Sequence, residues 1–525
     1  METPDVGIPP RLAERMSMAE QYEYLWSAHR RARPSRRRVL AGAGAGASAG
    51  ALAGGLLTGC SPAAPAPRAA TGGTAGRDVV PFGRHLSFGA DPRTRMRVSW
   101  QVPAPVRRPF VRLGVRPDEL GGRTEAEVRP LYTPGAQGVR PAVEQYYVHA
   151  ALDDLLPGTT YYYGVGHDGF DPAAPQHRAS IASFRTAPAR PERFVFTAFG
   201  DQGVGRGPVA VNRLLARERP AFHLHAGDIC YADRAGQGAR SDGYDPLVWD
   251  AFWRQSEPVA RSAPWLATTG NHDMEAWYSP DGYGGLLARF SLPDSGFAPR
   301  TTPGAYSFVY GNVGVVALDA NDVSYEIPAN LGRTEGRQTA WLRRTLGALR
   351  AADEVDFVVV FFHHCVHSTS THASDGGVRD AWLPLFEEHR VDLVINGHNH
   401  VYERTDAVRG GGVARPVPVG GSADPARDGT VYVTAGGGGR ALYGFQAGVA
   451  ESYEGHVTRH GEIDSFRWIR SGERAAETVE WSRVRYRGFS FFAVEVVAAP
   501  SPRLTVSARA ADGARIDRFE VRRGA

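Results

Sequence analysis

A chain of 525 residues is too long for a single hydrophobic core, so we expect two or three domains. The composition, 42% hydrophobic, 10% aromatic and 22% charged, is that of an ordinary globular protein and excludes wholesale disorder. Residues 1–38 hold eight Arg against five acidic residues, which leaves 52 basic and 51 acidic residues in the remainder. This near-neutral remainder excludes a broad basic surface for nucleic acid.

The N-terminal region has the features of an export signal. A twin arginine, Arg36-Arg37, directly precedes the uncharged Gly/Ala/Leu-rich run of residues 39–59. Seven Gly among these 21 residues disfavour the alternative, a membrane-spanning helix. The run ends in Leu-Thr-Gly-Cys60, which resembles the bacterial lipobox whose cysteine is lipidated and becomes the mature N-terminus.

We therefore expect a twin-arginine signal with lipobox over residues 1–60 and a flexible linker over residues 61–77. The protein would lie on the extracellular face of the cytoplasmic membrane as a lipoprotein, or be secreted. Beyond Cys60 only Cys230 and Cys365 remain. They could pair, but the simpler expectation is two small buried residues.

Residues 78–188 have the pattern of an all-β sandwich. Met96, Val98 and Trp100 alternate with polar neighbours, as do Tyr161 and Tyr163, and Pro and Gly separate such segments. A period of two predicts half-buried strands, and several of them in series predict a sandwich of the fibronectin type III kind. Because the segment carries no cluster of metal ligands or nucleophiles, a structural or docking role is favoured.

Residues 192–445 predict a second domain of layered α/β architecture. Near-continuous apolar runs occur at 194–199, 265–267, 313–318, 358–362 and 393–395, and such runs suit strands buried on both faces. Residues 338–349 carry apolar side chains at helical spacing. Residues 446–525 return to short alternating strands, such as 489–497, and we expect them to extend or cover the sheet of the second domain.

Polar side chains follow most of the apolar runs, in short loops marked by glycine. The five loops are Gly200-Asp201-Gln202-Gly203, Gly227-Asp228-Ile229-Cys230-Tyr231, Gly270-Asn271-His272-Asp273, His363 directly after its strand, and Gly397-His398-Asn399-His400. The ends of strands in α/β sheets are where ligands gather. Alone, each loop is more typical of a turn, a cap or a structural histidine. Five in chain order favour a metal centre.

Two carboxylates, a carboxamide, three imidazoles and a phenol form a mixed nitrogen and oxygen set that suits hard or borderline metals. One bridging carboxylate can hold two ions about 3.5 to 4 Å apart, the arrangement that clamps a phosphoryl group and activates water. The set has enough ligands for two ions.

This order of loops resembles the calcineurin-like metallophosphoesterase superfamily and, within it, the purple acid phosphatases of the exported bacterial type. The resemblance implies that Fe(III) is bound by Asp201, Tyr231 and His400. It implies that Asp228 bridges to a second, divalent metal (Fe, Zn or Mn) bound by Asn271, His363 and His398. Tyr231 makes the distinction within the superfamily, because no His follows Asp201 and the phenol replaces it. A tyrosinate on ferric iron absorbs visible light, so the loaded protein should be coloured.

The implied reaction is the hydrolysis of phosphate monoesters by attack of metal-bound hydroxide on phosphorus. His272 resembles the substrate-facing histidine of the family, with a structural role as the alternative. The acid that protonates the leaving group stays open among His364, His367 and His372, with His372 preferred. His363-His364-Cys365 stands where plant enzymes of the family carry His, a small residue and Pro.

Two further motifs are expected to be structural. Gly436 to Gly439 could cradle phosphate, but a flexible turn after a strand is favoured because no Lys and Ser/Thr follow them as in a P-loop. Glu403 and Arg404, after the last loop, are expected to pair structurally rather than act on substrate.

Two other functions compete with a phosphomonoesterase. A phosphodiesterase acting on nucleotides or lipid head groups would use the same centre. A surface adhesion or receptor protein would bind a partner through the sandwich and keep an inert metal domain. The loss of a metal ligand would favour that hypothesis, and none of the expected ligands is lost. The expected partners are small phosphate esters, with membrane contact only through the signal or a lipid anchor.

Overall fold

The computed structural model describes residues 79–135, 140–445, 456–459 and 461–524. The predicted export signal with Cys60 and the predicted linker lie outside the described residues. All contacts reported below fall within one unit of the chain, Gly72–Ala525. No helix in the described ranges is long and apolar enough to cross a membrane.

Two antiparallel four-stranded sheets form the N-terminal domain and share a hydrophobic core that includes Trp100 and Tyr163. The first sheet has the order β1 (Phe82–Phe88), β2 (Met96–Val102), β6 (Val143–Leu152) and β5 (Glu127–Thr133). The second has the order β4 (Gly122–Glu125), β3 (Phe110–Gly114), β7 (Thr160–Gly166) and β8 (Ala182–Arg185). The predicted all-β N-terminal domain is confirmed.

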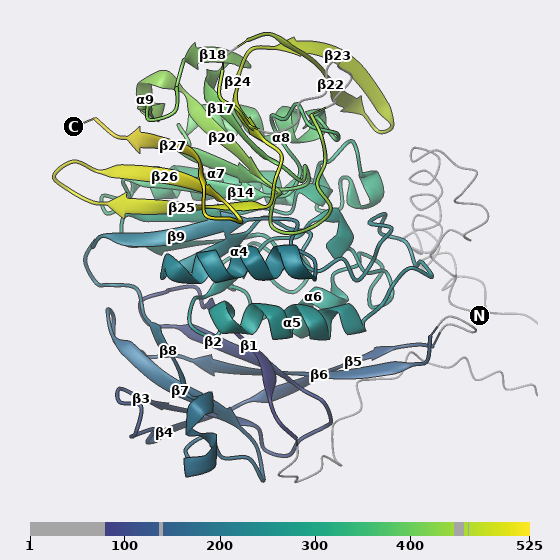
Figure 1. Cartoon of the computed structure of the whole chain (residues 1–525), viewed down its shortest axis with the longest axis vertical. Coiled ribbons are helices and arrows are strands. Elements are labelled where there is room, and N and C mark those ends of the chain that lie inside the picture. The colour runs from purple at the N-terminus through teal and green to yellow at the C-terminus, as the bar shows by residue number, and fades with distance from the viewer. Residues whose placement is uncertain (1–78, 136–139, 446–455, 460, 525) are drawn as a thin grey trace, which may run out of the picture. The chain divides into compact units, whose positions relative to one another are not determined.

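Strands β1 and β2 of the first sheet are buried on both faces, so the prediction of half-buried strands is wrong for β2. Its polar residues Ser99 and Gln101 are each 2% exposed. Gln101 Nε2 donates to Asp250 Oδ1 of helix α5 (Leu247–Ala260) at 2.7 Å. The ring of His85 on β1 stacks on Trp253 of the same helix, with centroids 3.6 Å apart. The polar alternation thus reflects a protein interface, which Figure 1 shows where α5 lies against β1 and β2.

Two large mixed sheets form the second domain, and each contains a run of adjacent parallel strands. The seven-stranded sheet has the order β11 (Trp265–Ala267), β10 (Phe222–His225), β9 (Phe194–Phe199), β25 (Ser490–Val497), β26 (Arg503–Ala510), β27 (Arg515–Arg522) and β19 (Ser422–Ala423). The nine-stranded sheet has the order β12 (Tyr306–Tyr310), β13 (Val313–Ala317), β14 (Phe357–Phe362), β16 (Leu393–Asn396), β20 (Thr430–Ala435), β17 (Tyr402–Arg409), β24 (Ser482–Tyr486) and β21 (His456–Val457), with β18 (Gly412–Arg415) beside β17.

Strand β14 shows why the apolar runs are continuous. Val359 and Phe361 pack in the core between the two sheets, whereas Val360 and Phe362 pack on the other side with Leu342 of helix α7. Both faces of the strand are therefore apolar, as expected for a buried parallel strand. Helix α7 (Arg337–Ala351) contains the predicted helical segment, and α8 (Gly376–Glu388) covers the same face.

The C-terminal strands extend the seven-stranded sheet, as expected. Strand β25 pairs antiparallel with β9, and β26 and β27 follow it (Figure 1). A small third sheet contains β15 (Ser374–Asp375), β22 (Ile463–Arg470) and β23 (Glu473–Val479). The other helices of the described residues are α4 (Arg206–Arg217), α6 (Gly284–Arg289) and α9 (Pro425–Asp428), with short 3-10 turns at Pro175–Ser180, Asn271–Asp273, Ala320–Asp322 and Pro328–Asn330.

A buried ion pair ties β17 to the C-terminal strand β27. Arg404 Nε lies 2.5 Å from Asp517 Oδ2, and Arg404 Nη2 lies 3.2 Å from Asp517 Oδ1. Both side chains are fully buried, and Tyr402 donates to the same carboxylate. Glu403 accepts hydrogen bonds from Ser368 and Thr369. Glu403 and Arg404 are thus structural, each with partners of its own.

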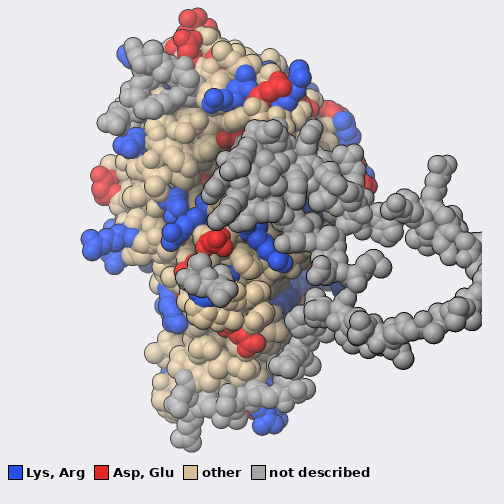
Figure 2. Space-filling view, turned by 90° about the vertical axis from the view of Figure 1, so that its right-hand side faces the viewer, with Lys and Arg blue, Asp and Glu red and all other residues tan. Residues whose placement is uncertain are grey.

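Charged side chains of both signs are interspersed over the described surface of the face in Figure 2.

The pair of Arg404 and Asp517 gives a test of the scaffold. Arg404→Met leaves the Asp517 carboxylate buried without its cation, which is expected to lower the free energy of unfolding by about 3–5 kcal/mol. Calorimetry of the whole protein should show a clear fall in the melting temperature. The control is Arg343→Met, which breaks an exposed pair with Glu388 and should change little. Equal melting temperatures for the two variants would contradict the structural role of the buried pair.

Candidate metal centre

The five predicted loops meet at one edge of the two facing sheets. Asp201, Asp228 and Asn271 follow the parallel strands β9, β10 and β11, and His363 and His398 follow the parallel strands β14 and β16. The loops are joined across the sheets, because the backbone N–H of His398 donates to Asp201 Oδ2 at 2.8 Å. This is the strand-end position at which α/β sheets bind ligands.

Three of the expected iron ligands form one group. Tyr231 Oη lies 3.0 Å from Asp201 Oδ1 and 2.8 Å from His400 Nε2. His400 Nε2 lies 3.3 Å from Asp201 Oδ1. A phenol, a carboxylate and an imidazole thus converge on one point.

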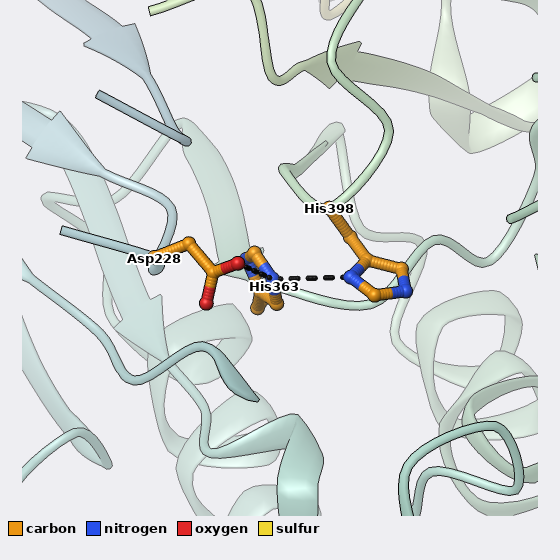
Figure 3. Close-up of side chains that lie close together, drawn as sticks. All are labelled: Asp228, His363 and His398. Atoms are coloured by element: carbon orange, nitrogen blue, oxygen red, sulfur yellow. Dashed lines mark hydrogen bonds and ion pairs between the residues drawn. The ribbon is translucent and has the colours of Figure 1, made fainter. Parts of the chain in front are cut away.

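The other four residues form a second group around one nitrogen atom. His363 Nε2 lies 3.1 Å from Asn271 Oδ1, 3.2 Å from Asp228 Oδ2 and 3.2 Å from His398 Nδ1. Figure 3 shows Asp228, His363 and His398 pointing toward one another. One imidazole nitrogen carries at most one hydrogen, so it cannot satisfy three such neighbours by hydrogen bonding. A cation between them would.

The outward nitrogens of the three histidines support the same interpretation. His363 Nδ1 donates to the carbonyl of Ala226 at 2.8 Å, and His400 Nδ1 donates to that of Ala441 at 2.6 Å. His398 Nε2 lies 2.9 Å from the Glu326 carboxylate. Each contact fixes the tautomer that leaves the inward nitrogen free for a metal. All seven ligands are at most 5% exposed. The residues therefore fit two ions with nitrogen and oxygen ligands.

The backbone at the ligands is held in the left-handed region. The φ angles are 58° at Asp201, 51° at Asp228, 60° at Tyr231 and 67° at His398. This region is unfavourable for residues other than glycine and costs on the order of 1–3 kcal/mol per residue. Such strain persists where the surrounding structure imposes it, and it clusters at functional sites.

Glycines allow the loops to approach the ligands. A Cβ atom at Gly270 would lie 2.2 Å from Asp228 Oδ1, and Gly227 combines a φ of +80° with a position where a Cβ would lie 2.9 Å from His363 Nδ1. The run at 436–439 behaves similarly. A Cβ at Gly436 would lie 2.7 Å from Asp201 Oδ2 and 2.2 Å from the carbonyl oxygen of Asn399. The prediction of a flexible turn there is wrong, because this loop packs tightly on the metal centre.

Electrostatics distinguish two of the ligands. Burial and the Asp201 carboxylate raise the pKa of Tyr231 well above its ordinary value, so a phenolate here requires a cation beside it. Burial lowers the pKa of His363, but the Asp228 and Asp201 carboxylates outweigh it and raise the pKa to about 9. Both groups thus hold a proton at neutral pH that a metal would displace.

Asp273 supports the second group, although the sequence assigned it no role. Its carboxylate accepts from the backbone N–H groups of Asp228 (2.8 Å), Ile229 (3.1 Å) and Gly270 (2.8 Å). These bonds tie the loop after β10 to the loop after β11. The signal was present in the sequence, because Asp273 lies in the same loop as Asn271.

Two of the four candidate catalytic histidines lie at the centre with partly open side chains. His272 stacks beside Tyr231 with centroids 4.4 Å apart, and its Nδ1 donates to the carbonyl of Asp233 at 2.6 Å. His372 is 28% exposed and lies beside His398, with centroids 4.4 Å apart. Burial lowers the pKa of His372, but the carboxylate of Glu326 at 2.5 Å outweighs it and raises the pKa.

The other two candidates lie in buried positions. His364 is fully buried against the ring of His398, and burial holds its pKa well below the ordinary value, so it is a poor acid. His367 packs against Tyr432 and Trp481 and receives a hydrogen bond from Arg379 at 3.1 Å. This environment favours a structural role for His367 over contact with phosphate.

Three residues that the sequence did not mark lie at the centre. Glu326, in the segment after the 3-10 turn Ala320–Asp322, contacts both His398 and His372. The guanidinium of Arg440 lies 4.4 Å from the centroid of the Tyr231 ring, and Tyr443 stacks on His400 at 3.9 Å. Arg440 directly follows the glycine run at 436–439, whereas no motif or strand end marks Glu326 and Tyr443.

Cys230 and Cys365 are both free and buried, which confirms the simpler expectation.

Comparison with known proteins identifies the family of the chain. The family described as "Purple acid Phosphatase, N-terminal domain" matches residues 81–186, and the family "Calcineurin-like phosphoesterase" matches residues 207–402. An uncharacterized protein of Mycobacterium tuberculosis is 35% identical over 384 residues, which cover 68% of this chain and 69% of that protein. Purple acid phosphatase 23 of Arabidopsis thaliana is 29% identical over 55% of this chain and 62% of its own length.

Among solved structures, purple acid phosphatase PPD1 from yellow lupin seeds shares the fold. It superposes with a TM-score of 0.62 at 20% identity, over 85% of this chain and 75% of the lupin chain. The multi-domain fold, a β-rich domain before a metallophosphoesterase domain, is thereby confirmed. The protein is a phosphoester hydrolase with a dinuclear metal centre. The chain belongs to the calcineurin-type metallophosphoesterases of the purple acid phosphatase family.

Proposed function

We propose that the protein hydrolyses phosphate monoesters at a centre of Fe(III) and a second divalent metal, Fe, Zn or Mn. The observation that carries this proposal is the position of Tyr231, whose phenol oxygen lies 2.8 Å from His400 Nε2 and 3.0 Å from Asp201 Oδ1. A phenol among an imidazole and a carboxylate is a ligand set for ferric iron. Asp201, Tyr231 and His400 would hold the iron, Asp228 would bridge, and Asn271, His363 and His398 would hold the second metal.

The bound metals would polarise the phosphoryl group and lower the pKa of water, which supplies the nucleophile at neutral or acidic pH. The surrounding residues orient the substrate and move protons. His272, half-buried beside Tyr231, faces the phosphate. His372 protonates the leaving oxygen through Nε2, since its Nδ1 is engaged by Glu326. This assignment fits the raised pKa of His372, which keeps the imidazole protonated for the transfer.

We also propose that the protein is exported by the twin-arginine route, either anchored through a lipid on Cys60 or secreted. Support comes from Arg36-Arg37 before an uncharged run and from the lipobox-like end of that run. Its substrates would then be phosphate esters outside the cytoplasm.

The first test is activity on a monoester and a diester. Asp228→Asn removes the charge of the bridging ligand, so kcat/KM for p-nitrophenyl phosphate should fall at least about 100-fold, with loss of metal measured on the same sample. The wild type should prefer p-nitrophenyl phosphate over bis(p-nitrophenyl) phosphate. The opposite preference would favour a phosphodiesterase, and a metal-loaded wild type inactive on both would refute the proposal.

Colour tests the iron site. The loaded wild type should show a broad visible absorption band that is lost in Tyr231→Phe. Tyr443→Phe is the matched control, because Tyr443 stacks on His400 without being one of the proposed ligands, and it should keep the band. A colourless wild type that contains two metals but no iron would exclude the tyrosinate centre and leave a different metal pair.

Metal binding should release protons at pH 7. His363, with a pKa raised to about 9, and the Tyr231 phenol both carry a proton that the metal displaces. Loading the metal-free protein should therefore release about two protons, and affinity should rise with pH, less steeply above about pH 9, where His363 is already deprotonated but the Tyr231 phenol is not. Calorimetry in two buffers of different ionisation enthalpy measures the release. Tyr231→Phe should release one proton fewer, and an unchanged number would contradict ligation by the phenol.

A further inference from the structure

One buried carboxylate contacts two functional imidazoles at once. Glu326 Oε1 lies 2.5 Å from His372 Nδ1, and Glu326 Oε2 lies 2.9 Å from His398 Nε2. Glu326 is 5% exposed. A buried carboxylate is costly unless it is paired, so this position requires both partners.

The segment that carries Glu326 is fastened in place by Asp375. The Asp375 carboxylate accepts from Ser324 Oγ at 2.7 Å, from the backbone N–H of Glu326 at 3.1 Å and from that of Gly377, at the start of α8, at 2.8 Å. A Cβ atom at Gly377 would lie 1.9 Å from the carbonyl oxygen of Val323. The Glu326 segment and the start of α8 are therefore a single packed unit. This packing holds the Glu326 carboxylate in place.

The triad of Glu326, His372 and His398 could also suggest a third metal position. However, His398 Nδ1 already faces His363 at 3.2 Å. A cation at His398 Nε2 as well would require His398 to bridge two ions as an imidazolate. His398 would then lose the Nε2 proton, which the Glu326 carboxylate stabilises. The His398 contact, at 2.9 Å, has the length of a charge-assisted hydrogen bond, and the His372 contact, at 2.5 Å, is shorter still. Both contacts are therefore assigned as hydrogen bonds rather than as ligands of a third ion.

The two hydrogen bonds have different consequences. At His398 the bond places the proton on Nε2, which directs the lone pair of Nδ1 toward the second metal. At His372 the bond holds Nδ1, which leaves Nε2 as the nitrogen that can face a leaving group. The backbone of His372 is fixed as well, since its N–H donates to Asn399 Oδ1 at 2.8 Å and its carbonyl accepts from Trp468 Nε1 at 3.0 Å.

We propose that Glu326 is a positioning residue that orients both the second-metal ligand His398 and the proton donor His372. This inference rests on the proposed phosphatase function. In the reaction, the bond from phosphorus to the leaving oxygen breaks as the bond from phosphorus to the oxygen of water forms. The leaving oxygen takes a proton from His372 Nε2, and the imidazole is reprotonated by the proton that water releases. Glu326 stays ionised throughout and changes no bond of its own.

Glu326→Gln tests the shared contact, because an amide has one acceptor oxygen where the carboxylate has two. Two readouts are expected to change. Zn²⁺ affinity at the second position, measured by competition with a chromophoric chelator, should fall about 10–100-fold. The ratio of kcat/KM for p-nitrophenyl phosphate to that for ethyl phosphate should rise about 100-fold or more, because only the alkyl leaving group depends on a proton donor.

The matched control is Tyr325→Phe, the neighbouring residue, whose hydroxyl bonds only to the exposed Asp380 side chain at 3.3 Å. It should leave both readouts unchanged. If Glu326→Gln does not fold, as judged by circular dichroism, Glu326→Asp takes its place. Aspartate keeps the charge but is one methylene shorter, so both changes should appear in smaller size.

A double-mutant cycle with His372→Phe shows whether Glu326 acts through His372. The double variant should have the same leaving-group ratio as His372→Phe alone. A Glu326→Gln protein with wild-type Zn²⁺ affinity and a wild-type ratio, or with an equal loss on both substrates, would overturn the inference. A wild type that binds no second metal or hydrolyses neither ester would instead refute the proposed function.

Discussion

The structure depends on one constraint: seven buried side chains that fit as metal ligands turn oxygen and nitrogen atoms toward each other in the interior, an arrangement that bound cations would stabilise. His363 Nε2 alone has three such neighbours within 3.2 Å. The surrounding structure must offset the unfavourable free energy of this crowding. Four of the ligands have left-handed backbone angles, and glycines beside them leave no room for a side chain. Asp273 joins two of the loops through backbone N–H groups. The conformation of these loops is therefore the one that a pair of bound metals would require.

The rest of the second domain keeps these loops in register. Parallel strands from two sheets end at the same edge, and apolar side chains fill the space between the sheets and beneath the helices. The C-terminal strands are part of this frame, since β25 pairs with β9, and the buried pair of Arg404 and Asp517 links β17 to β27. The ligands thus depend on segments that lie more than a hundred residues further along the chain.

Much of this was predictable from local pattern. The runs at 194–199 and 265–267 are strands with the same bounds, and the ligand loops are marked by glycine and polar residues directly after their strands. Residues brought to the site by tertiary contacts alone were not predictable. Glu326 and Tyr443 follow no strand and belong to no motif, so nothing local distinguishes them. The candidate histidines show the same limit, because proximity in sequence to His363 does not decide that His372 is partly open while His367 lies in the core.

The interface between the sandwich and helix α5 makes the two domains of this chain structurally dependent on each other. Gln101 bonds to Asp250, and His85 stacks on Trp253, so the first sheet covers a helix that begins sixteen residues after Tyr231. The polar side chain of Gln101 on β2 thus has its partner on α5 rather than in water. Replacing the sandwich with an unrelated module would remove these partners from helix α5. The two domains occupy separate parts of the sequence and match separate family models, but they form one structural unit through this interface.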